Sequence, residues 1–168
     1  MRILGIDPGT ATSGYGIIDV DNGAAGVVGW GLLETEKNGF TEKRLESIFK
    51  QTAEIIKKYH PDIFAIEKIF FAANAKTAIA VGQAQGLMLL AASKANIEVM
   101  EYAPGTIKKT VAGNGRAKKK DIQKAVRKIL GNKVRSKAKE KTHFDNAADA
   151  LAVALCHSLK GKGGENNG

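Results

Sequence analysis

Cysteine and long apolar runs are both scarce in this chain of 168 residues. Cys156 is the only cysteine, which excludes a disulfide framework and a zinc site built from cysteines. No apolar run approaches the ~20 residues that span a bilayer, and no signal-peptide pattern opens the sequence. We therefore expect a cytoplasmic protein with one ordinary domain, residues 1–159, followed by a disordered polar tail, residues 160–168.

Acidic residues are almost missing from one segment. Between Lys108 and Lys141 the chain holds 14 of its 26 Lys and Arg residues but only 2 of its 17 acids, a local charge of +12 against −3 for the remainder. A merely solvated face usually mixes both signs, so this basic block indicates contact with a polyanion such as nucleic acid. No aromatic residue interleaves with these lysines, so stacking on bases requires side chains from elsewhere, and Phe70 and Phe71 are the nearest candidates.

The first acid of interest follows a short apolar run. Ile3, Leu4 and Ile6 predict a buried strand that ends at Asp7, and Tyr15–Val20 predicts a second strand that forms a hairpin with it. A carboxylate at the end of a buried strand is costly to desolvate without a partner. Asp7 therefore either accepts a hydrogen bond from the backbone of the turn that follows it, or binds a basic group or a metal.

A second acid occupies the same kind of position. Val27–Glu34 predicts a third strand. The three- and four-residue spacing of apolar residues then predicts a helix from Thr41 to Tyr59, with its N-cap supplied by Thr41 or by the preceding turn. The apolar run Asp62–Glu67 then predicts a strand parallel to the first one. Two carboxylates, Asp7 and Glu67, would then meet at one sheet edge, where a divalent cation such as Mg²⁺ or Mn²⁺ relieves their repulsion.

The second half of the chain is mostly helical in pattern. Asn74–Ala95 predicts a long helix whose Gly82 and Gly86 share one face, for packing on the sheet or for a homodimer contact. Ile97–Tyr102 predicts a fifth strand, a short helical piece follows from Pro104, and Lys120–Leu130 predicts a basic helix.

The last predicted helix, Phe144–Leu159, carries a third acid. Asp145 is expected to be the N-cap of this helix. Asp149 lies one turn further in, among small residues that have to pack closely on another element, and Asn146 precedes Asp149 by three positions. Side chains at these positions lie near one another at the start of the helix.

The order of these elements is that of a ribonuclease-H-like α/β domain, with a mixed five-stranded sheet flanked by helices. Four motifs in order, IDPGTATSGYG, AIEKIFFAAN, GQAQG and DNAADALAVALCH, make the chain resemble the RuvC family of bacterial Holliday-junction resolvases over residues 1–158. The resemblance implies a homodimeric endonuclease that nicks four-way DNA junctions symmetrically, uses two Mg²⁺ or Mn²⁺ ions per site, and cooperates with the RuvA–RuvB branch-migration complex.

The resemblance also implies roles for individual residues. Asp7, Glu67, Asn146 and Asp149 match the catalytic metal ligands. Phe70 matches an aromatic that wedges into the junction, and Lys108 and Lys119 match lysines that handle DNA. Arg116 and Lys118 join the DNA-binding set because they belong to the cation cluster that follows a Gly-containing loop.

One position departs from the family pattern, because an acid or a His usually stands where this chain has Asn146. Three explanations are open: Asp145 compensates for the missing acid, the natural enzyme tolerates the amide, or the residue was changed to trap substrate. Three other functions compete with the resolvase reading: a sugar-kinase or actin-like ATPase, for which the chain is too short, a non-catalytic junction-binding module, and a related nuclease acting on RNA.

Overall fold

The computed structural model describes residues 1–9, 11–36, 39–69, 74–131 and 141–161, without the side chains of 141–146. The described residues form five strands and five helices. In chain order they are β1 (Arg2–Asp7), β2 (Thr12–Asp21), β3 (Ala24–Glu34), α1 (Thr41–Tyr59), β4 (Ile63–Glu67), α2 (Ala75–Lys94), β5 (Glu98–Tyr102), α3 (Pro104–Ala112), α4 (Lys119–Leu130) and α5 (Lys141–Gly161).

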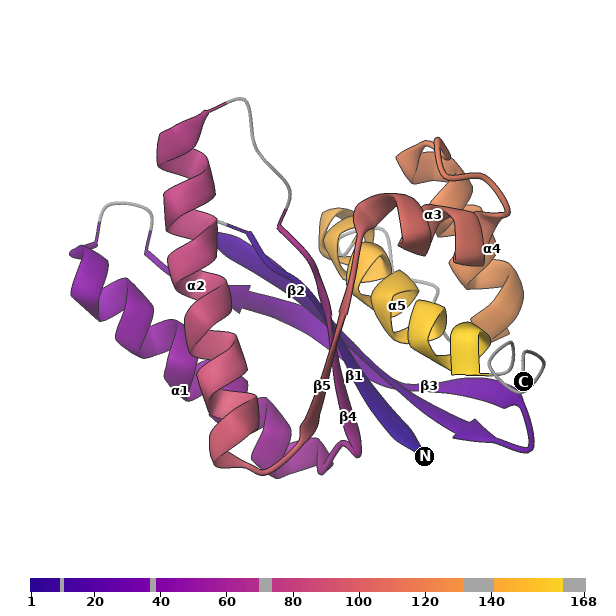
Figure 1. Ribbon diagram of the computed structural model, residues 1–168, viewed down its shortest axis with the longest axis horizontal. Coiled ribbons are helices and arrows are strands. Elements are labelled where there is room, and N and C mark those ends of the chain that lie inside the picture. The colour runs from indigo at the N-terminus through magenta and orange to yellow at the C-terminus, as the bar shows by residue number, and fades with distance from the viewer. Residues whose placement is uncertain (10, 37–38, 70–73, 132–140, 162–168) are drawn as a thin grey trace, which may run out of the picture.

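The five strands form one mixed sheet in the order β3-β2-β1-β4-β5. The pairs β1–β2 and β2–β3 are antiparallel, whereas β1–β4 and β4–β5 are parallel. The expected mixed five-stranded α/β architecture is therefore confirmed. Helices α1 and α2 cover one face of the sheet, and α3, α4 and α5 cover the other (Figure 1).

Alternation along β1 divides the core between these two faces. Ile3 points into the layer of α3, α4 and α5, whereas Leu4 and Ile6 point into the layer of α1 and α2. Helix α5 lies against the middle of the sheet and is fully buried from Ala150 to Cys156, which explains its small side chains. None of the helices within the described ranges combines the length and the apolar character needed to cross a bilayer.

Close contact between α5 and β1 requires glycine at position 5. A Cβ on Gly5 would lie 2.7 Å from the Ala154 nitrogen and 2.9 Å from its Cβ. We expect Gly5→Ala to lower the free energy of unfolding by about 1–3 kcal/mol through overpacking, measured by urea denaturation. Gly26→Ala is the matched control, since a Cβ on this strand glycine meets nothing within 4 Å. Equal losses in the two variants would contradict the close packing.

Two predicted boundaries and one predicted cap need correction, whereas the predicted bounds of α1, Thr41 and Tyr59, are confirmed. Helix α5 begins at Lys141, so residue 145 lies inside the helix and the N-cap role predicted for Asp145 is wrong. Phe40 is the N-cap of α1 and supplies no side-chain hydrogen bond. Lys160 belongs to α5, which continues to Gly161, and residues 162–168 lie outside the described residues.

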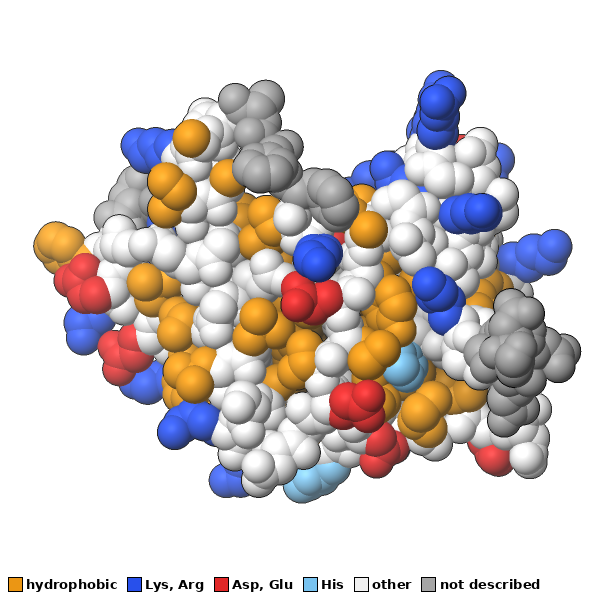
Figure 2. All heavy atoms as spheres, in the orientation of Figure 1, with side chains coloured by type: hydrophobic (Ala, Val, Ile, Leu, Met, Phe, Trp, Pro, Cys, Tyr) orange, Lys and Arg blue, Asp and Glu red, His pale blue; other side chains and the backbone are white. Residues whose placement is uncertain are grey.

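The glycine face of α2 does not pack on the sheet. A Cβ on Gly82 or Gly86 would meet nothing within 4 Å, and both residues line a groove of about 670 Å³ between α1 and α2. Hydrophobic side chains gather over these two helices in Figure 2. Of the two roles predicted for these glycines, packing on the sheet is therefore wrong, and a contact with another chain stays a prediction.

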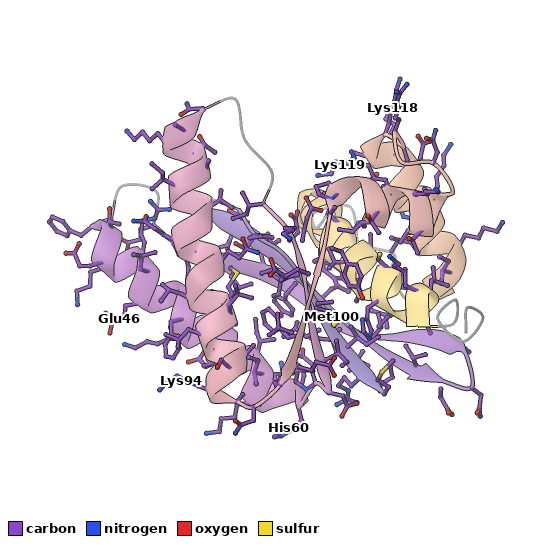
Figure 3. All side chains as sticks on the ribbon, viewed as in Figure 1. Glu46, His60, Lys94, Met100, Lys118 and Lys119 are labelled. Carbon is purple, nitrogen blue, oxygen red and sulfur yellow. The ribbon has the colours of Figure 1, made fainter. Side chains whose placement is uncertain are left out.

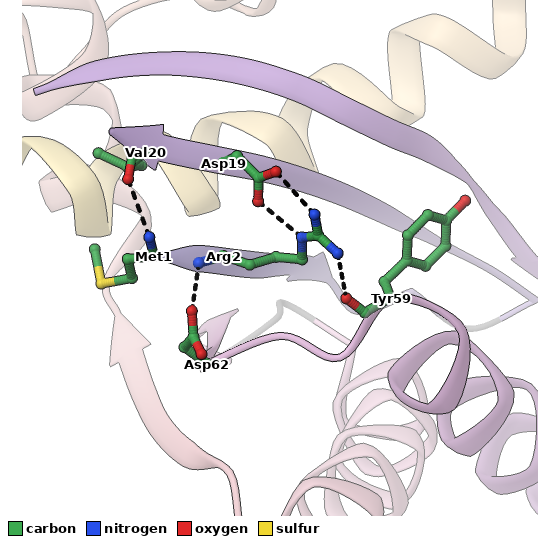
Figure 4. Close-up of polar contacts among 6 residues, drawn as sticks. All are labelled: Met1, Arg2, Asp19, Val20, Tyr59 and Asp62. Carbon is green, nitrogen blue, oxygen red and sulfur yellow. Dashed lines mark hydrogen bonds and ion pairs between the residues drawn. The ribbon is translucent and has the colours of Figure 1, made fainter. Parts of the chain in front are cut away.

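A polar network fixes the amino end of β1 (Figure 4). The Arg2 guanidinium donates to both carboxylate oxygens of Asp19, at 2.7 and 2.8 Å, and to the Tyr59 carbonyl at 2.8 Å. The Arg2 backbone N–H donates to the Asp62 carboxylate. Hydrogen bonding from Arg2 lowers the pKa of Asp19. These contacts tie β1 to β2 and to the end of α1, so the opposite end of β1 is held in a defined register.

Candidate active site

Three carboxylates converge beside the carboxyl ends of the central strands. Asp7 is the last residue of β1 and Glu67 the last of β4, and these strands are parallel neighbours, with Ile6 paired to Ile66. Asp149 joins them from α5. All three line a pocket of about 220 Å³ together with a set of basic and apolar residues: Pro104, Ile107, Lys108, Lys119, Ile122 and Ala152. Carboxylates from both ends and the middle of the sequence therefore share one pocket.

Burial and mutual repulsion make these carboxylates hard to ionise. Desolvation, followed by the charges of Glu67 and Asp149, raises the pKa of Asp7 to about 7 from its ordinary 3.8, against the opposing effect of Lys119. Desolvation and the charge of Asp149 also raise the pKa of Glu67, and Lys108 opposes this rise. Carboxyl groups in a pocket with raised pKa values are characteristic of functional sites, because the fold gains no stability from them.

Two lysines reach the same pocket. The Lys119 ammonium lies 3.1 Å from an Asp149 carboxylate oxygen, and the Asp149 side chain is 28% exposed. Lys119 comes from the first turn of α4 and Lys108 from α3, so the basic segment predicted from the sequence contributes directly to this site. Among the side chains that the structure describes, no three His, Cys, Asp or Glu residues are spaced as ligands of one ion. The metal-ligand roles of Asp7, Glu67 and Asp149 therefore stay predictions.

The other predicted site residues lie apart from the pocket or outside the described residues. Arg116 and Lys118 are exposed on the segment that leads into α4, and Lys118 points away from the body of the protein (Figure 3). Position 146 lies in α5, but its side chain is outside the described residues, as is the whole of Phe70. The structure thus brings together five of the nine predicted residues: Asp7, Glu67, Lys108, Lys119 and Asp149.

The turn after β1 bears on the turn hypothesis for Asp7. The Gly9 backbone N–H donates to the Ser13 hydroxyl at 3.0 Å, and Pro8 has no N–H to offer. Among the residues described in this turn, neither Pro8 nor Gly9 therefore offers Asp7 a free backbone N–H, and Asp7 lines the pocket. The buried Ser13 hydroxyl was not predicted to have this role, although its place in the small-residue turn was visible in the sequence.

Comparison with known proteins identifies the family. The sequence model of "Crossover junction endodeoxyribonuclease RuvC" matches residues 3–157. This chain belongs to the RuvC family. A RuvC from Thermotoga petrophila is 43% identical over 162 residues, covering 96% of this chain and 94% of the relative. A Fusobacterium nucleatum RuvC is 45% identical over 157 residues, covering 94% of this chain and 80% of that relative.

A solved RuvC structure extends this similarity to the fold. Thermus thermophilus RuvC in complex with a Holliday-junction substrate has a TM-score of 0.86 and 31% sequence identity, covering 98% of this chain and 96% of that one. The ribonuclease-H-like fold predicted from the sequence is therefore confirmed, as is the resemblance to the RuvC family.

Proposed function

We propose that this chain is an endonuclease that resolves four-way DNA junctions by metal-dependent hydrolysis of phosphodiester bonds. The observation that carries the proposal is the convergence of Asp7, Glu67 and Asp149 in one pocket of a RuvC-family chain. The described residues that line the pocket include no cysteine or histidine nucleophile, in keeping with hydrolysis that needs only a water molecule. The proposed location is the cytoplasm, where a bacterial enzyme meets DNA junctions.

The donor set suits a hard divalent cation. Carboxylate oxygens are the ligands that Mg²⁺ and Mn²⁺ prefer, and bound cations remove the repulsion that raises the pKa values of Asp7 and Glu67. Asp7, Glu67 and Asp149 would hold the metal, together with position 146. When bound, two such ions activate water and stabilise the leaving oxygen.

The basic residues have a separate task. Lys108 and Lys119 lie in the pocket, where their ammonium groups attract a phosphate and offset the negative charge of the carboxylates. Arg116 and Lys118, exposed beyond the pocket, would hold the DNA backbone further along. Phe70, in the segment after β4, remains the proposed wedge at the branch point.

Cleavage of defined substrates tests the proposed function. A four-way junction, a plain duplex and an RNA–DNA hybrid of equal length are incubated with the protein in Mg²⁺ or Mn²⁺. We expect paired nicks in the junction only, and their loss on chelation or in Glu67→Gln. Cleavage of the hybrid in preference would indicate an RNA nuclease, and binding without cleavage in either metal would indicate a non-catalytic junction-binding module.

Lys119 makes a testable contribution to DNA affinity. Each phosphate contact made by a lysine contributes roughly 0.9 to the slope of log affinity against log salt concentration. We expect Lys119→Ala to reduce this slope for junction binding by about one unit, measured by fluorescence anisotropy between low and moderate salt. Lys43→Ala is the control, because Lys43 is on α1 and pairs with Glu46. An unchanged slope in Lys119→Ala would place this lysine off the DNA path.

The groove between α1 and α2 supports a homodimer as part of the proposal. Its floor is apolar, and Leu90 and Ile79 on α2 are 47% and 63% exposed. Glu46 and Lys94 at its rim carry opposite charges, which suits a two-fold interface that pairs a surface with its own copy. The RuvA–RuvB branch-migration complex is the further partner that membership of the family suggests.

Disrupting the groove should produce a monomer. We expect Leu90→Asp to weaken self-association by roughly 100-fold, because a carboxylate would be buried in an apolar interface. Analytical ultracentrifugation over a concentration series measures the change. Ile129→Asp, which alters an exposed apolar residue of α4 outside the groove, should leave association intact. A wild-type chain that is monomeric throughout, or a dimeric Leu90→Asp, would contradict the proposed interface.

A further inference from the structure

A further pocket lies at the end of the molecule opposite the candidate active site. Its volume is about 460 Å³, and it is formed by the carboxyl-terminal ends of α1 and α2 with the residues that precede β4 and β5. In Figure 3, His60 and Lys94 lie at the lower end of the molecule and Lys119 at the upper end. We call it the helix-end pocket; its buried floor includes Ile56, Pro61 and Ala91, and its exposed rim carries Lys57, His60 and Lys94.

The cations on this rim have no acidic partner. Among the described residues that line the helix-end pocket none is acidic, and neither Lys57 nor Lys94 forms an ion pair with a side chain that the structure describes. The two acids next to the lining residues in sequence are engaged elsewhere. The Asp62 carboxylate accepts from the Arg2 backbone N–H, and the charge of Glu98 acts on the opposite layer of the protein. The rim is therefore an uncompensated basic surface around an apolar floor.

His60 adds a hydrogen-bonding group in an unusual backbone conformation. It follows α1 with φ 49° and ψ 58°, the left-handed region in which glycine or asparagine is the usual residue after a helix. A larger side chain is strained there, and this strain places an imidazole at the rim of the pocket. Strained conformations of this kind concentrate at sites where the side chain is needed.

The chemistry of the lining describes its occupant. Lys57 on α1 and Lys94 on α2 stand on two sides of the floor, so the occupant carries one bulky apolar group flanked by carboxylates. A nucleic-acid backbone matches the cations but leaves the apolar floor uncovered. We propose that the helix-end pocket is a docking site for a partner protein, which inserts one apolar side chain of an acidic segment between Lys57 and Lys94.

The place of the pocket leaves both proposed surfaces of the chain available. Pro61 and Ile97 precede β4 and β5, whereas Glu67 ends β4 at the candidate active site. At ~3.3 Å per residue, these strands separate the two pockets by roughly 15 Å, so a docked partner leaves the carboxylates open to DNA. Phe49 and Lys94 also line the groove between α1 and α2, but the remainder of the lining lies outside that groove, so a dimer formed through the groove does not need it.

Binding of a synthetic peptide tests the docking site. The probe is a short fluorescein-labelled peptide of Asp and Gly with one central Phe, followed by fluorescence anisotropy at low salt. We expect saturable binding that weakens by about 10-fold or more when Ala replaces the Phe, in Ala95→Trp, which fills the pocket, and in Lys57→Glu. Lys58→Glu is the matched control and should bind as the wild type does, because Lys58 lies over the Tyr59 ring and does not line the pocket.

The remaining occupants are outcomes of the same measurements. No binding, equal binding of the Phe and Ala peptides, or an equal loss in Lys58→Glu would overturn the docking site, the last two by reducing it to a general polyanion patch. Dissociation of a wild-type dimer by Ala95→Trp, measured by sedimentation, would assign the pocket to a second copy and also overturn the proposal.

A junction-bound sample separates this proposal from the proposed function. We expect the peptide to bind with the same affinity when a four-way junction saturates the protein in Ca²⁺, and Lys57→Glu to cut junctions at the wild-type rate. Competition between peptide and junction would contradict the separation of the two sites. Peptide binding by a chain that cuts nothing would retain the docking site and refute the nuclease, whereas cleavage without peptide binding would refute the docking site alone.

Discussion

Asp7→Asn is expected to lower junction cleavage by roughly 10³-fold while making the metal-free protein more stable. The loss of activity follows because Asp7 contributes a carboxylate to the pocket shared with Glu67 and Asp149. The gain in stability follows because the same carboxylate is buried beside two others, and the amide keeps its shape without its charge. A residue that opposes folding is retained where function requires it.

The raised pKa of Asp7 predicts how the stability gained in Asp7→Asn changes with pH. The pKa of Asp7 is about 7 in the folded protein and 3.8 as the ordinary value, so between these values the folded state binds more protons than the unfolded state. The contribution of Asp7 to the free energy of unfolding is therefore fully present below about pH 4, and the wild type loses it as the pH rises to about 7. We expect the free energy of unfolding of Asp7→Asn to exceed that of the wild type by roughly 2 kcal/mol at pH 8 and by much less at pH 5, measured by urea denaturation in EDTA.

A control isolates the buried position. Asp21→Asn removes an exposed carboxylate at the end of β2, away from the pocket, and should leave the difference in stability between pH 5 and pH 8 as it is in the wild type. The account is wrong about Asp7 if Asp7→Asn is destabilising at both pH values, or if it cleaves at the wild-type rate.

Asn146→Asp is the second large effect that we expect, a rise in Mg²⁺-dependent cleavage of about 10-fold or more. Position 146 precedes Asp149 by three residues in α5, and the resemblance to the RuvC family predicts an acid or a His there. An amide oxygen is a weaker ligand than a carboxylate, so this chain should bind junctions well but cut them slowly. Single-turnover cleavage with saturating protein measures the chemical step apart from binding.

Asp145→Asn separates the possible explanations of Asn146. If Asp145 supplies the carboxylate that Asn146 lacks, Asp145→Asn should lose cleavage in the wild-type background. The same substitution should keep cleavage when it is combined with Asn146→Asp. Equal single-turnover rates for the wild type and Asn146→Asp would mean that the natural enzyme tolerates the amide. No cleavage by either protein, with junction binding intact, would favour a non-catalytic module.

Sequence reasoning placed the carboxylates correctly because strand ends are strongly encoded. Apolar runs indicated where β1 and β4 end. Helix α1 before β4 allows β4 to pair in parallel with β1, and this pairing brings Asp7 and Glu67 to one edge of the sheet. Asp149 followed from a small-residue helix that needs close packing. The start of α5 did not follow, because the capping preference of Asp145 suggested a later start and local preference is a weak guide to a helix boundary.

Features that depend on tertiary approach were not predictable. The Lys119–Asp149 contact joins α4 to α5 at an angle that no periodicity specifies. The helix-end pocket arises where Ile56, Ala91 and Ile97 from three separate parts of the chain leave a gap, and a gap has no pattern in sequence. For Gly82 and Gly86, spacing predicted a shared face, but only the structure reveals that this face lies on a groove and not on the sheet.

Direct measurement of Mn²⁺ binding tests whether the carboxylates form one metal site. Electron paramagnetic resonance of free Mn²⁺ during a protein titration gives affinity and stoichiometry without DNA or catalysis. We expect wild-type binding to weaken by at least about 10-fold in each of Asp7→Asn, Glu67→Gln and Asp149→Asn, and to be unchanged in Asp21→Asn. Equal Mn²⁺ affinity in all these proteins would contradict a shared metal site in this pocket.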